Sequence, residues 1–508
     1  MAENPDSRIQ PDVNHGDKAD QPSSTEHTVD VETATTEKAY FSKLSVWLMI
    51  LFSGLAIGSD GYNAAVIGNV NLVLAILYPT TLTPEIRQRL SNAFLIGMII
   101  GMLTFGVVAD QLGRKTGAVA TTILLVVGIA MSAGASGTSE TGMFWMLIVA
   151  RGVAGVGAGG EYPVAGAGAA EATDESAAHR KHRGFMFAML ADLSASLGYV
   201  WAGLVPLLLL LMVGGEQTTG GYVVVWRAAF ALGALPPLVI FWFRVRMAVS
   251  TAYRRSAMRK QRTPYLLALK RYWRPLLGCS GTWFLYNWIS IPFGIFSSTI
   301  ISRVNAGESL VKTLGWGVVI NCFYIPGPFL GGYLSDRIGR RRTMALGFTL
   351  QAVLGFVLGG AIGPIQDVFP LFVVMYGVFL TLGEVGPGST VVITSTECFP
   401  TSIRGQMMGM VAAWSKVGAA LGTQVFTAIL NAYVDDPAKG NQAAFLIGSG
   451  FALAGAAVAL FVMPEASRNL DDDDREWKKY LDDNGWEATW GDSTTEDPAG
   501  VVLGTARS

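Results

Sequence analysis

The chain has 508 residues, of which 51% are hydrophobic and 15% are charged, with a formal net charge of −1. Its mean hydropathy is +0.40. Soluble globular proteins carry about 25% charged residues, so this composition excludes a soluble globular protein and indicates a chain that crosses a membrane many times.

Residues 1–43 are polar and lack apolar periodicity, which is typical of a disordered tail. A membrane-spanning helix needs about 20 apolar residues, and twelve apolar runs of this kind follow. The predicted spans cover roughly 45–75, 92–110, 116–136, 143–170, 185–212, 224–243, 276–302, 312–334, 343–363, 369–396, 406–432 and 443–463. This pattern predicts an all-α polytopic membrane protein with a six-helix bundle over 44–243, a second six-helix bundle over 275–464 and an acidic tail over 465–508.

Residues 244–274, between the two halves, carry ten basic residues and no acidic one. Short loops rich in Lys and Arg stay in the cytoplasm, so we expect a cytoplasmic linker. Because six spans lie on each side of it, both termini should be cytoplasmic too. A basic block can also bind nucleic acid, but its place between two spans favours the topological role, and we expect no nucleic-acid partner.

A ten-residue motif, G-x-x-x-D-x-x-G-R-[KR], follows both the second and the eighth predicted span. Its key positions are Gly106, Asp110 and Arg114 in the first copy and Gly332, Asp336 and Arg340 in the second. Two copies in register within a 6+6 layout resemble the signature of the major facilitator superfamily. The resemblance implies two six-helix bundles around a site near the membrane midplane, with alternating access. It also implies that these motifs form a gate and do not touch the substrate.

The fourth predicted span contains RGVAGVGAGGEYP, with five glycines and then Glu161. Glycines at 155 and 159 would let a neighbouring helix pack against bare backbone. An ionisable side chain at bilayer depth costs a few kcal/mol and normally faces a cavity or a partner, so Glu161 is a functional candidate. Other ionisable residues well inside predicted spans include Asp60, Arg151, Asp192, Glu384 and Lys416.

Two acids and one base are the minimum set for coupling protons to an anion. Asp60 and Glu161 could carry a proton, Lys416 could counter an anionic substrate, and Asp192 is a third candidate for proton coupling. Each of these residues could instead form an interhelical ion pair that holds the bundle together. This alternative weighs most for Arg151, Asp192 and Glu384.

The fourth-span run resembles the signature of the phosphate:proton symporter family, as do Ser59-Asp60-Gly61-Tyr62 in the first span and Lys416 in the eleventh. Residues 281–298 of the seventh span most resemble the fungal glycerophosphodiester permeases within that family. The resemblance implies a substrate site whose residues are Asn63, Tyr162, Ser194, Trp283, Asn287 and Lys416.

Three positions depart from the phosphate pattern. The seventh-span Trp-x-x-x-Asp-x-x-x-Tyr reads Trp283, Asn287 and Ile291 here, and Ser194 stands where the fifth-span glutamine is expected. The lost carboxylate removes a protonatable group, so inorganic phosphate fits less well and a bulkier organic anion fits better.

We therefore expect a plasma-membrane secondary transporter that acts as a monomer and moves a small polar organic anion, such as a glycerophosphodiester or phosphate, together with H⁺. The alternatives are a sugar or polyol porter and a nutrient sensor that binds without transport. The sequence shows no nucleotide loop, nucleophile constellation or metal-ligand spacing, so we expect no enzyme, cofactor or metal.

Overall fold

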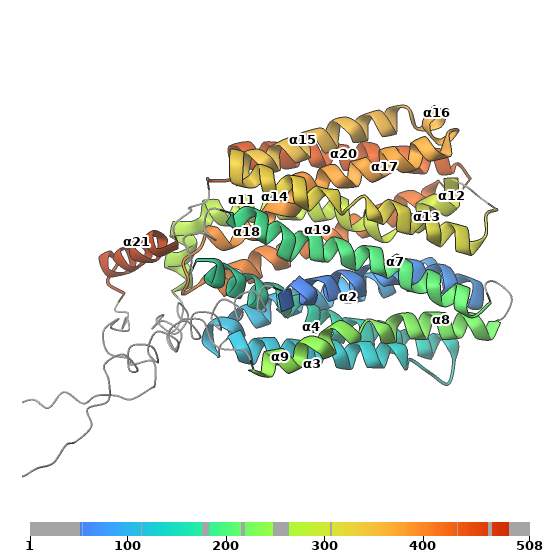
Figure 1. The fold of residues 1–508 in the computed structure, drawn as a ribbon, viewed down its shortest axis with the longest axis horizontal. Helices are drawn as coiled ribbons and strands as arrows, with labels where there is room; N and C mark the ends of the chain where they lie inside the picture. The colour runs from blue at the N-terminus through green and yellow to red at the C-terminus, as the bar shows by residue number, and fades with distance from the viewer. Residues whose placement is uncertain are drawn as a thin grey trace, which may run out of the picture. The chain divides into compact units, whose positions relative to one another are not determined.

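The computed structural model describes residues 51–52, 54–112, 114–174, 182–214, 219–246, 264–304, 307–433, 435–465 and 470–486. All of them belong to one unit, Met49–Ser508. Every regular element in this part of the chain is helical, and Figure 1 shows most of the helices lying side by side along one direction. Helices suit a lipid environment because each one closes its own backbone hydrogen bonds. The predicted all-α fold is confirmed.

The first half begins with a span at Gly54–Leu77. It continues with α2 (Pro84–Gln111), α3 (Arg114–Ala133) and α4 (Glu140–Asp174). The fifth span is built from α6 (Arg183–Phe187), η1 (Ala188–Leu193) and α7 (Ser194–Met212). The sixth consists of α8 (Thr219–Leu232) and α9 (Leu235–Arg246).

The second half begins with α11 (Tyr265–Ile295) and α12 (Ser297–Val304), which meet at a bend of 56°. Next come α13 (Leu310–Cys322), α14 (Pro326–Ile338), α15 (Arg340–Gly360) and the short α16 (Ile362–Gln366). The tenth span is α17 (Phe369–Gly383), η3 (Glu384–Gly388) and α18 (Ser389–Glu397). The chain continues through α19 (Arg404–Ala432), α20 (Pro437–Phe461) and α21 (Leu470–Asp483).

Ten of the described helices are long and apolar enough to cross a membrane, and the bent pair α11 and α12 makes eleven. The predicted span that this count leaves out is the eleventh, 406–432, which corresponds to α19; this helix has 29 residues and lies along α11 and α2. At 1.5 Å per residue it is about 43 Å long, enough to cross the hydrocarbon core. Lys416 and other buried polar side chains of α19 lower its hydropathy because they face protein.

Glycines of α4 allow close helix packing in the first half, as their spacing predicts. A Cβ atom at Gly155 would collide with the carbonyl oxygen of Phe94, and one at Gly159 with that of Met98. Both carbonyls belong to α2, so two helices meet here through bare backbone. This contact orients α4 and the functional candidates on it.

Two spans contain a π-helical turn, η1 in the fifth span and η3 in the tenth. π-Helical turns are rare and are frequently found at functional sites. Asp192 lies in η1 and Glu384 begins η3, so both turns carry a buried carboxyl group.

The acidic tail contains a helix, α21, that is not among the predicted elements. Its Trp477 is fully buried, with its ring 5.6 Å from that of Tyr272 at the beginning of α11. The amide of Thr401 donates to Asp474 at 2.6 Å, and Arg271 pairs with Glu476 at 2.8 Å. The tail helix is therefore docked against α11 and the turn between α18 and α19.

The predicted tail over residues 1–43 lies outside the described residues, as do the side chains of Asp110 and Arg114. Most of the predicted linker also lies outside them: α9 runs to Arg246 and α11 begins at Tyr265.

Candidate functional site

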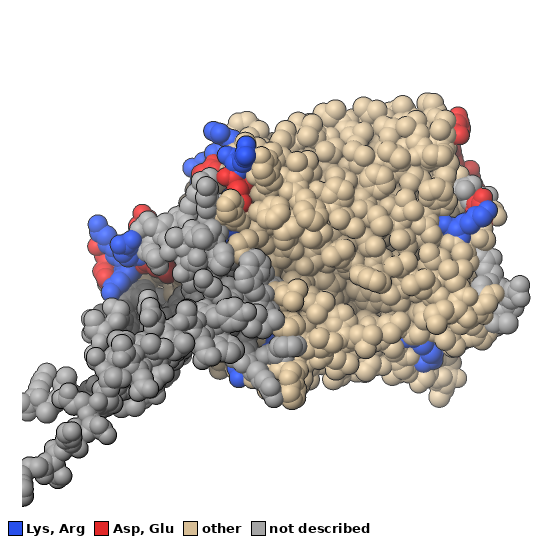
Figure 2. Space-filling view, in the orientation of Figure 1, with Lys and Arg blue, Asp and Glu red and all other residues tan. Residues whose placement is uncertain are grey.

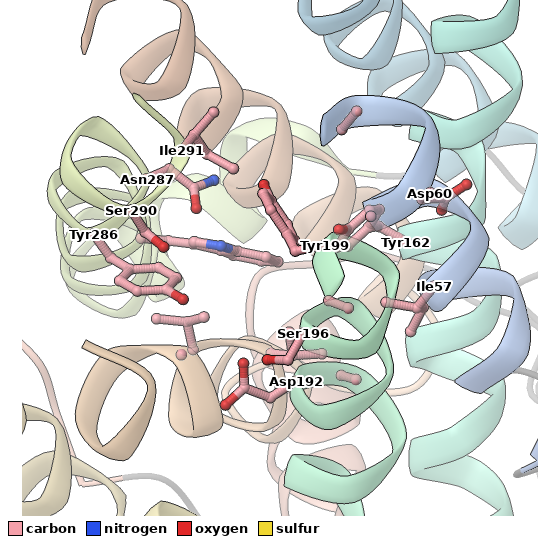
Figure 3. A pocket seen from close by; sticks show the side chains of 18 of the residues that line it. Ile57, Asp60, Tyr162, Asp192, Ser196, Tyr199, Tyr286, Asn287, Ser290 and Ile291 are labelled. Atoms are coloured by element: carbon pink, nitrogen blue, oxygen red, sulfur yellow. The ribbon is translucent and has the colours of Figure 1, made fainter. Parts of the chain in front are cut away.

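A cavity of about 80 Å³ lies between the two halves, near the middle of several spans. Figure 3 shows Tyr286, Asn287 and Ser290 on one side of it, with Asp60 and Tyr162 on the other and Asp192 near its base. The predicted site residues that line it are Asp60, Tyr162, Asp192, Trp283, Asn287 and Lys416. Six of the predicted residues, from five spans, are therefore brought together.

Lys416 brings a positive charge to this cavity. Its side chain is buried, and its Nζ lies 5.1 Å from the ring centre of Tyr162, within the range of a cation–π contact. The ring of Tyr162 lies 6.2 Å from that of Trp283. No ion pair in the described part of the chain includes Lys416. The ammonium is thus set among aromatic rings without a bound carboxylate.

Asp60 is the carboxyl group at the first-span side of the cavity. Only 1% of it is exposed, and neither carboxyl oxygen has a hydrogen-bond partner among the described residues. An unpaired carboxylate is costly to bury. Asp60 is therefore suited to hold a proton or to receive a cation from the cavity.

Glu161 does not line the cavity. Both of its carboxyl oxygens are bound by the guanidinium of Arg244 from α9, and Thr121 of α3 donates to one of them at 2.8 Å. Both members of the ion pair are buried. The network joins α3, α4 and α9 inside the first half, and the structure brings Glu161 to Arg244 and not to Lys416.

Two predicted substrate residues, Asn63 and Ser194, also lie away from the cavity lining. The Asn63 amide donates to the carbonyl oxygens of Ser59 at 2.9 Å and Gly233 at 3.3 Å. The Ser194 hydroxyl donates to the Met189 carbonyl at 3.3 Å. Both side chains satisfy backbone groups of the first half.

Arg151 is a structural cation of the first half. Its Nε donates to the Leu90 carbonyl at 2.8 Å, and its guanidinium lies over the rings of Phe94 and Phe230. No ion pair among the described residues includes it. The alternative of an interhelical ion pair is thus replaced by hydrogen bonds and ring contacts.

Asn287 and the pair Asp192 and Glu384 complete the polar lining. The Asn287 amide donates to the Ser415 hydroxyl at 3.1 Å. Glu384 accepts from the Tyr286 hydroxyl at 2.5 Å and from the Ser290 hydroxyl at 3.3 Å, and its Oε2 lies near Asp192 at Gly388. Glu384 thus lies in the cavity wall, and no ion pair of the described residues includes it.

The two halves meet at the motif end of the cavity through Asp336. Its carboxylate accepts from the backbone amides of Gly184 and Phe185 at 2.9 Å each, and it pairs with Arg340 at 3.0 Å. Glu397 joins this cluster by pairing with Arg183 and Arg340. The motif glycines also approach the opposite half, Gly106 at Gly405 and Gly332 at Phe185. Of the motif residues that the structure describes, Gly106, Gly332, Asp336 and Arg340, none lines the cavity.

The halves also meet toward the opposite end. The Ser298 hydroxyl donates to the Asn69 side chain at 2.8 Å, and the Asn69 amide donates to the Ala202 carbonyl at 3.0 Å. Asn321 donates to the Tyr199 carbonyl at 3.3 Å. The cavity is therefore flanked by contacts between the halves on both sides, and its volume suffices for several water molecules.

Other residues of the lining were not predicted as site residues: Ser196, Tyr199, Tyr286, Ser290, Tyr324 and Glu384. Tyr286 follows Trp283 by three positions, so the two share a helix face, and this spacing could have identified it. Uncharged hydroxyls inside apolar runs give no comparable signal.

A family model described as "Sugar (and other) transporter" matches residues 46–271 and 247–477. Glycerophosphoinositol permease 1 of Candida albicans is 39% identical over 453 residues, which cover 88% of this chain and 84% of that protein. Glycerophosphoinositol transporter 1 of Saccharomyces cerevisiae is 34% identical over 469 residues, covering 91% and 88%.

Among solved structures, the proton:xylose symporter XylE bound to 6-bromo-6-deoxy-D-glucose superposes with a TM-score of 0.72. The match covers 85% of this chain and 99% of that one at 16% identity. At this identity the likeness demonstrates a shared fold.

Proposed function

The chain belongs to the sugar (and other) transporter family of the major facilitator superfamily, and on this premise we propose that it moves a glycerophosphodiester together with a proton. It is a multi-pass membrane transporter and not an enzyme. We infer that it works in the plasma membrane as a monomer, with cytoplasmic termini, because the basic residues of 244–274 favour the cytoplasmic side.

The observation that carries the proposal is the state of Lys416. A buried ammonium costs several kcal/mol unless an anion answers it, yet no ion pair of the described residues includes this one. It faces a cavity between the halves, where a substrate must bind in an alternating-access transporter. A phosphodiester carries one negative charge and would supply the missing anion.

The rest of the lining favours an organic phosphodiester over inorganic phosphate. Asn287 offers an amide where a carboxylate is expected for phosphate, and Tyr162, Trp283 and Tyr286 offer ring faces. Aromatic rings and hydroxyls suit a glycerol and its polar head group better than a bare oxyanion. The relatives described above are named as glycerophosphoinositol carriers, which agrees with this choice.

Coupling would follow from an exchange of partners. In the empty protein Lys416 and Asp60 line the same cavity, so the ammonium is a counter-charge for the carboxylate. A bound phosphodiester would take over Lys416, and Asp60 would then bind a proton because its charge has lost its counter-ion. Asp60 lines the cavity whereas Arg244 neutralises Glu161, so Asp60 is the better placed of the two proposed proton carriers.

The gate would be formed by the contacts on either side of the cavity. We propose that the Asp336 cluster breaks when the cavity opens toward one side, and that the contact between Asn69 and Ser298 breaks when it opens toward the other. An organic anion needs more room than the present cavity, so loading requires one of these contacts to release.

The test is uptake into cells that lack their own transporters, with radiolabelled glycerophosphoinositol, phosphate and xylose at two external pH values. We expect uptake of glycerophosphoinositol that is faster at the lower pH, and little uptake of xylose. Preferential uptake of xylose or another neutral sugar would replace the proposal by the sugar or polyol reading, which the family model's description also allows.

A further inference from the structure

Asp192 and Glu384 bring two carboxyl groups together across the boundary between the halves. Asp192 comes from η1 in the fifth span and Glu384 from η3 in the tenth. Both side chains line the cavity, and Oε2 of Glu384 and Oδ1 of Asp192 gather at the same glycine, Gly388. Figure 3 shows the carboxyl group of Asp192 at the base of the cavity, on the side toward Tyr286.

Gly388 makes this meeting possible. A Cβ atom at 388 would collide with Oε2 of Glu384 and would lie 2.9 Å from Oη of Tyr286 and 3.1 Å from Oδ1 of Asp192. The two carboxyl groups and the phenol thus gather against a bare Cα atom. The π-helical turn that ends at Gly388 holds both Glu384 and this glycine.

Two buried carboxyl groups this close can be joined only through a proton. An ionised carboxylate only accepts hydrogen bonds, so two ionised groups cannot bond to each other and repel. The Tyr286 and Ser290 hydroxyls already donate to Oε1 of Glu384, which leaves Oε2 toward Asp192. One proton on Asp192 or Glu384 therefore holds the pair together.

No cation of the described residues pairs with these carboxyl groups; Lys416 lines the same cavity but lies against the ring of Tyr162. The titratable groups that face the pair are Tyr286, Tyr199 and Tyr324 beside Glu384 and Tyr162 beside Asp192. No ion pair among the described residues includes either carboxyl group. Asp192 is buried, and its Oδ2 has no hydrogen-bond partner in the described part of the chain. Oδ2 of Asp192 is therefore the carboxyl oxygen of the pair that no described group binds.

We propose that Asp192 and Glu384 form a second proton-binding site, a shared-proton latch that joins the two halves while the cavity is closed. The inference rests on the proposed transport function, but the latch is distinct from the exchange at Asp60 and Lys416. When the proton leaves to water in the cavity, two like charges remain in contact and repel. The halves then part, so release of this proton favours opening.

The latch can be tested without a substrate. Spin labels at Thr116→Cys near the beginning of α3 and Arg342→Cys near the beginning of α15 would report the separation of the halves at the motif end, on the side of the latch, in protein whose Cys279, Cys322 and Cys398 are first replaced by alanine. In the otherwise unchanged protein we expect the longer distance to gain population as the pH rises. One released proton allows the closed-to-open ratio to change by up to about tenfold per pH unit.

The decisive variant is Glu384→Gln. Its amide can donate to Asp192 permanently, so the link between the halves persists and the distance distribution should no longer respond to pH. Asp192→Asn should act in the same way from the other half. The control is Asp482→Asn, an exposed carboxyl group of α21 outside the cavity, which should keep the pH response.

Two results would overturn the latch. One is a distance distribution of the unchanged protein that does not vary with pH. The other is a pH response in Glu384→Gln or Asp192→Asn equal to that of the unchanged protein. Because no substrate is present, these results do not depend on whether the transported anion is a glycerophosphodiester.

Discussion

The carboxylate of Glu161 is bound by the guanidinium of Arg244, and both side chains are buried in the first half. This ion pair neutralises Glu161. Glu161 and Asp60 are the two acids that the fourth and first spans contribute as proposed proton carriers. Of these two acids, only Asp60 lines the cavity together with Lys416. The proposed partner exchange therefore involves one acid, one base and the incoming anion.

Replacing Glu161 should act mainly on stability. Glu161→Gln leaves Arg244 as a buried charge without a counter-ion, and breaking a buried pair in this way costs about 3–5 kcal/mol. We expect a lower midpoint of thermal unfolding in detergent, measured by fluorescence-detected size-exclusion chromatography. The double variant Glu161→Gln/Arg244→Gln should recover part of the loss, and a single-variant midpoint within about 2 °C of the wild type would contradict the assignment.

Proton coupling should depend on Asp60. Asp60→Asn should still exchange labelled for unlabelled glycerophosphoinositol across a liposome membrane but should no longer accumulate it when the outside is more acidic. Glu161→Gln tests the other proposed carrier in the same assay. If both variants accumulate substrate as the wild type does, neither residue carries the coupled proton.

Lys416 should decide the charge of the substrate. Lys416→Gln breaks no ion pair of the described residues, so the folded protein should persist. A hydrogen bond to a charged group contributes about 1.5–3 kcal/mol, which corresponds to a loss of affinity for the phosphodiester of roughly 10–100-fold. Binding measured by scintillation proximity gives the affinity, with Lys416→Arg as the control that keeps the charge. Near-normal affinity in Lys416→Gln would favour a neutral substrate.

Asp336 should control turnover and not affinity. It bonds the backbone of Gly184 and Phe185 across the halves and does not line the cavity. Asp336→Asn weakens this closure, so the maximal uptake rate should fall by about tenfold, while the half-saturating concentration changes little. Arg337→Gln, at an exposed neighbouring position, is the matched control. A loss of affinity at unchanged maximal rate would count against the gate.

The docking of α21 should depend on Trp477. A substitution at this position should therefore make the tail sensitive to protease. Trp477 is fully buried against Tyr272, and Trp→Ala in a packed site costs about 3–5 kcal/mol. Trp477→Ala should therefore expose residues 470–483 to cleavage, read by mass spectrometry after brief trypsin treatment. Asp483→Ala, at an exposed position of the same helix that is not a trypsin site, should leave the tail protected. Equal cleavage rates in the two variants would show that the helix does not depend on this contact.

The spans, the gate motif and most of the cavity could be predicted because charges inside apolar runs are conspicuous. The partner of Glu161 could not. Arg244 stands where a span ends, and a long cationic side chain there can reach outward to water or fold back into the bundle. In the sequence Arg244 counts among the basic residues of the predicted linker, whereas in the structure its guanidinium points into the first half and binds Glu161.

The meeting of Asp192 with Glu384 was also beyond the sequence. It depends on the way two spans of different halves pack and on two π-helical turns, neither of which leaves a periodic pattern. The tail helix is a different case. Trp477, Tyr480 and Leu481 follow the spacing of one helix face. The sequence after the run of aspartates therefore does carry a signal for this helix.

The central claim is that one proton enters with the organic anion. Purified protein in liposomes that contain a pH-sensitive dye measures this directly when glycerophosphoinositol is added outside without an imposed pH gradient. If one proton enters with each anion, the lumen should acidify only when the substrate is present. This acidification should be absent in Asp60→Asn. Entry of labelled glycerophosphoinositol with no acidification of the lumen would contradict it.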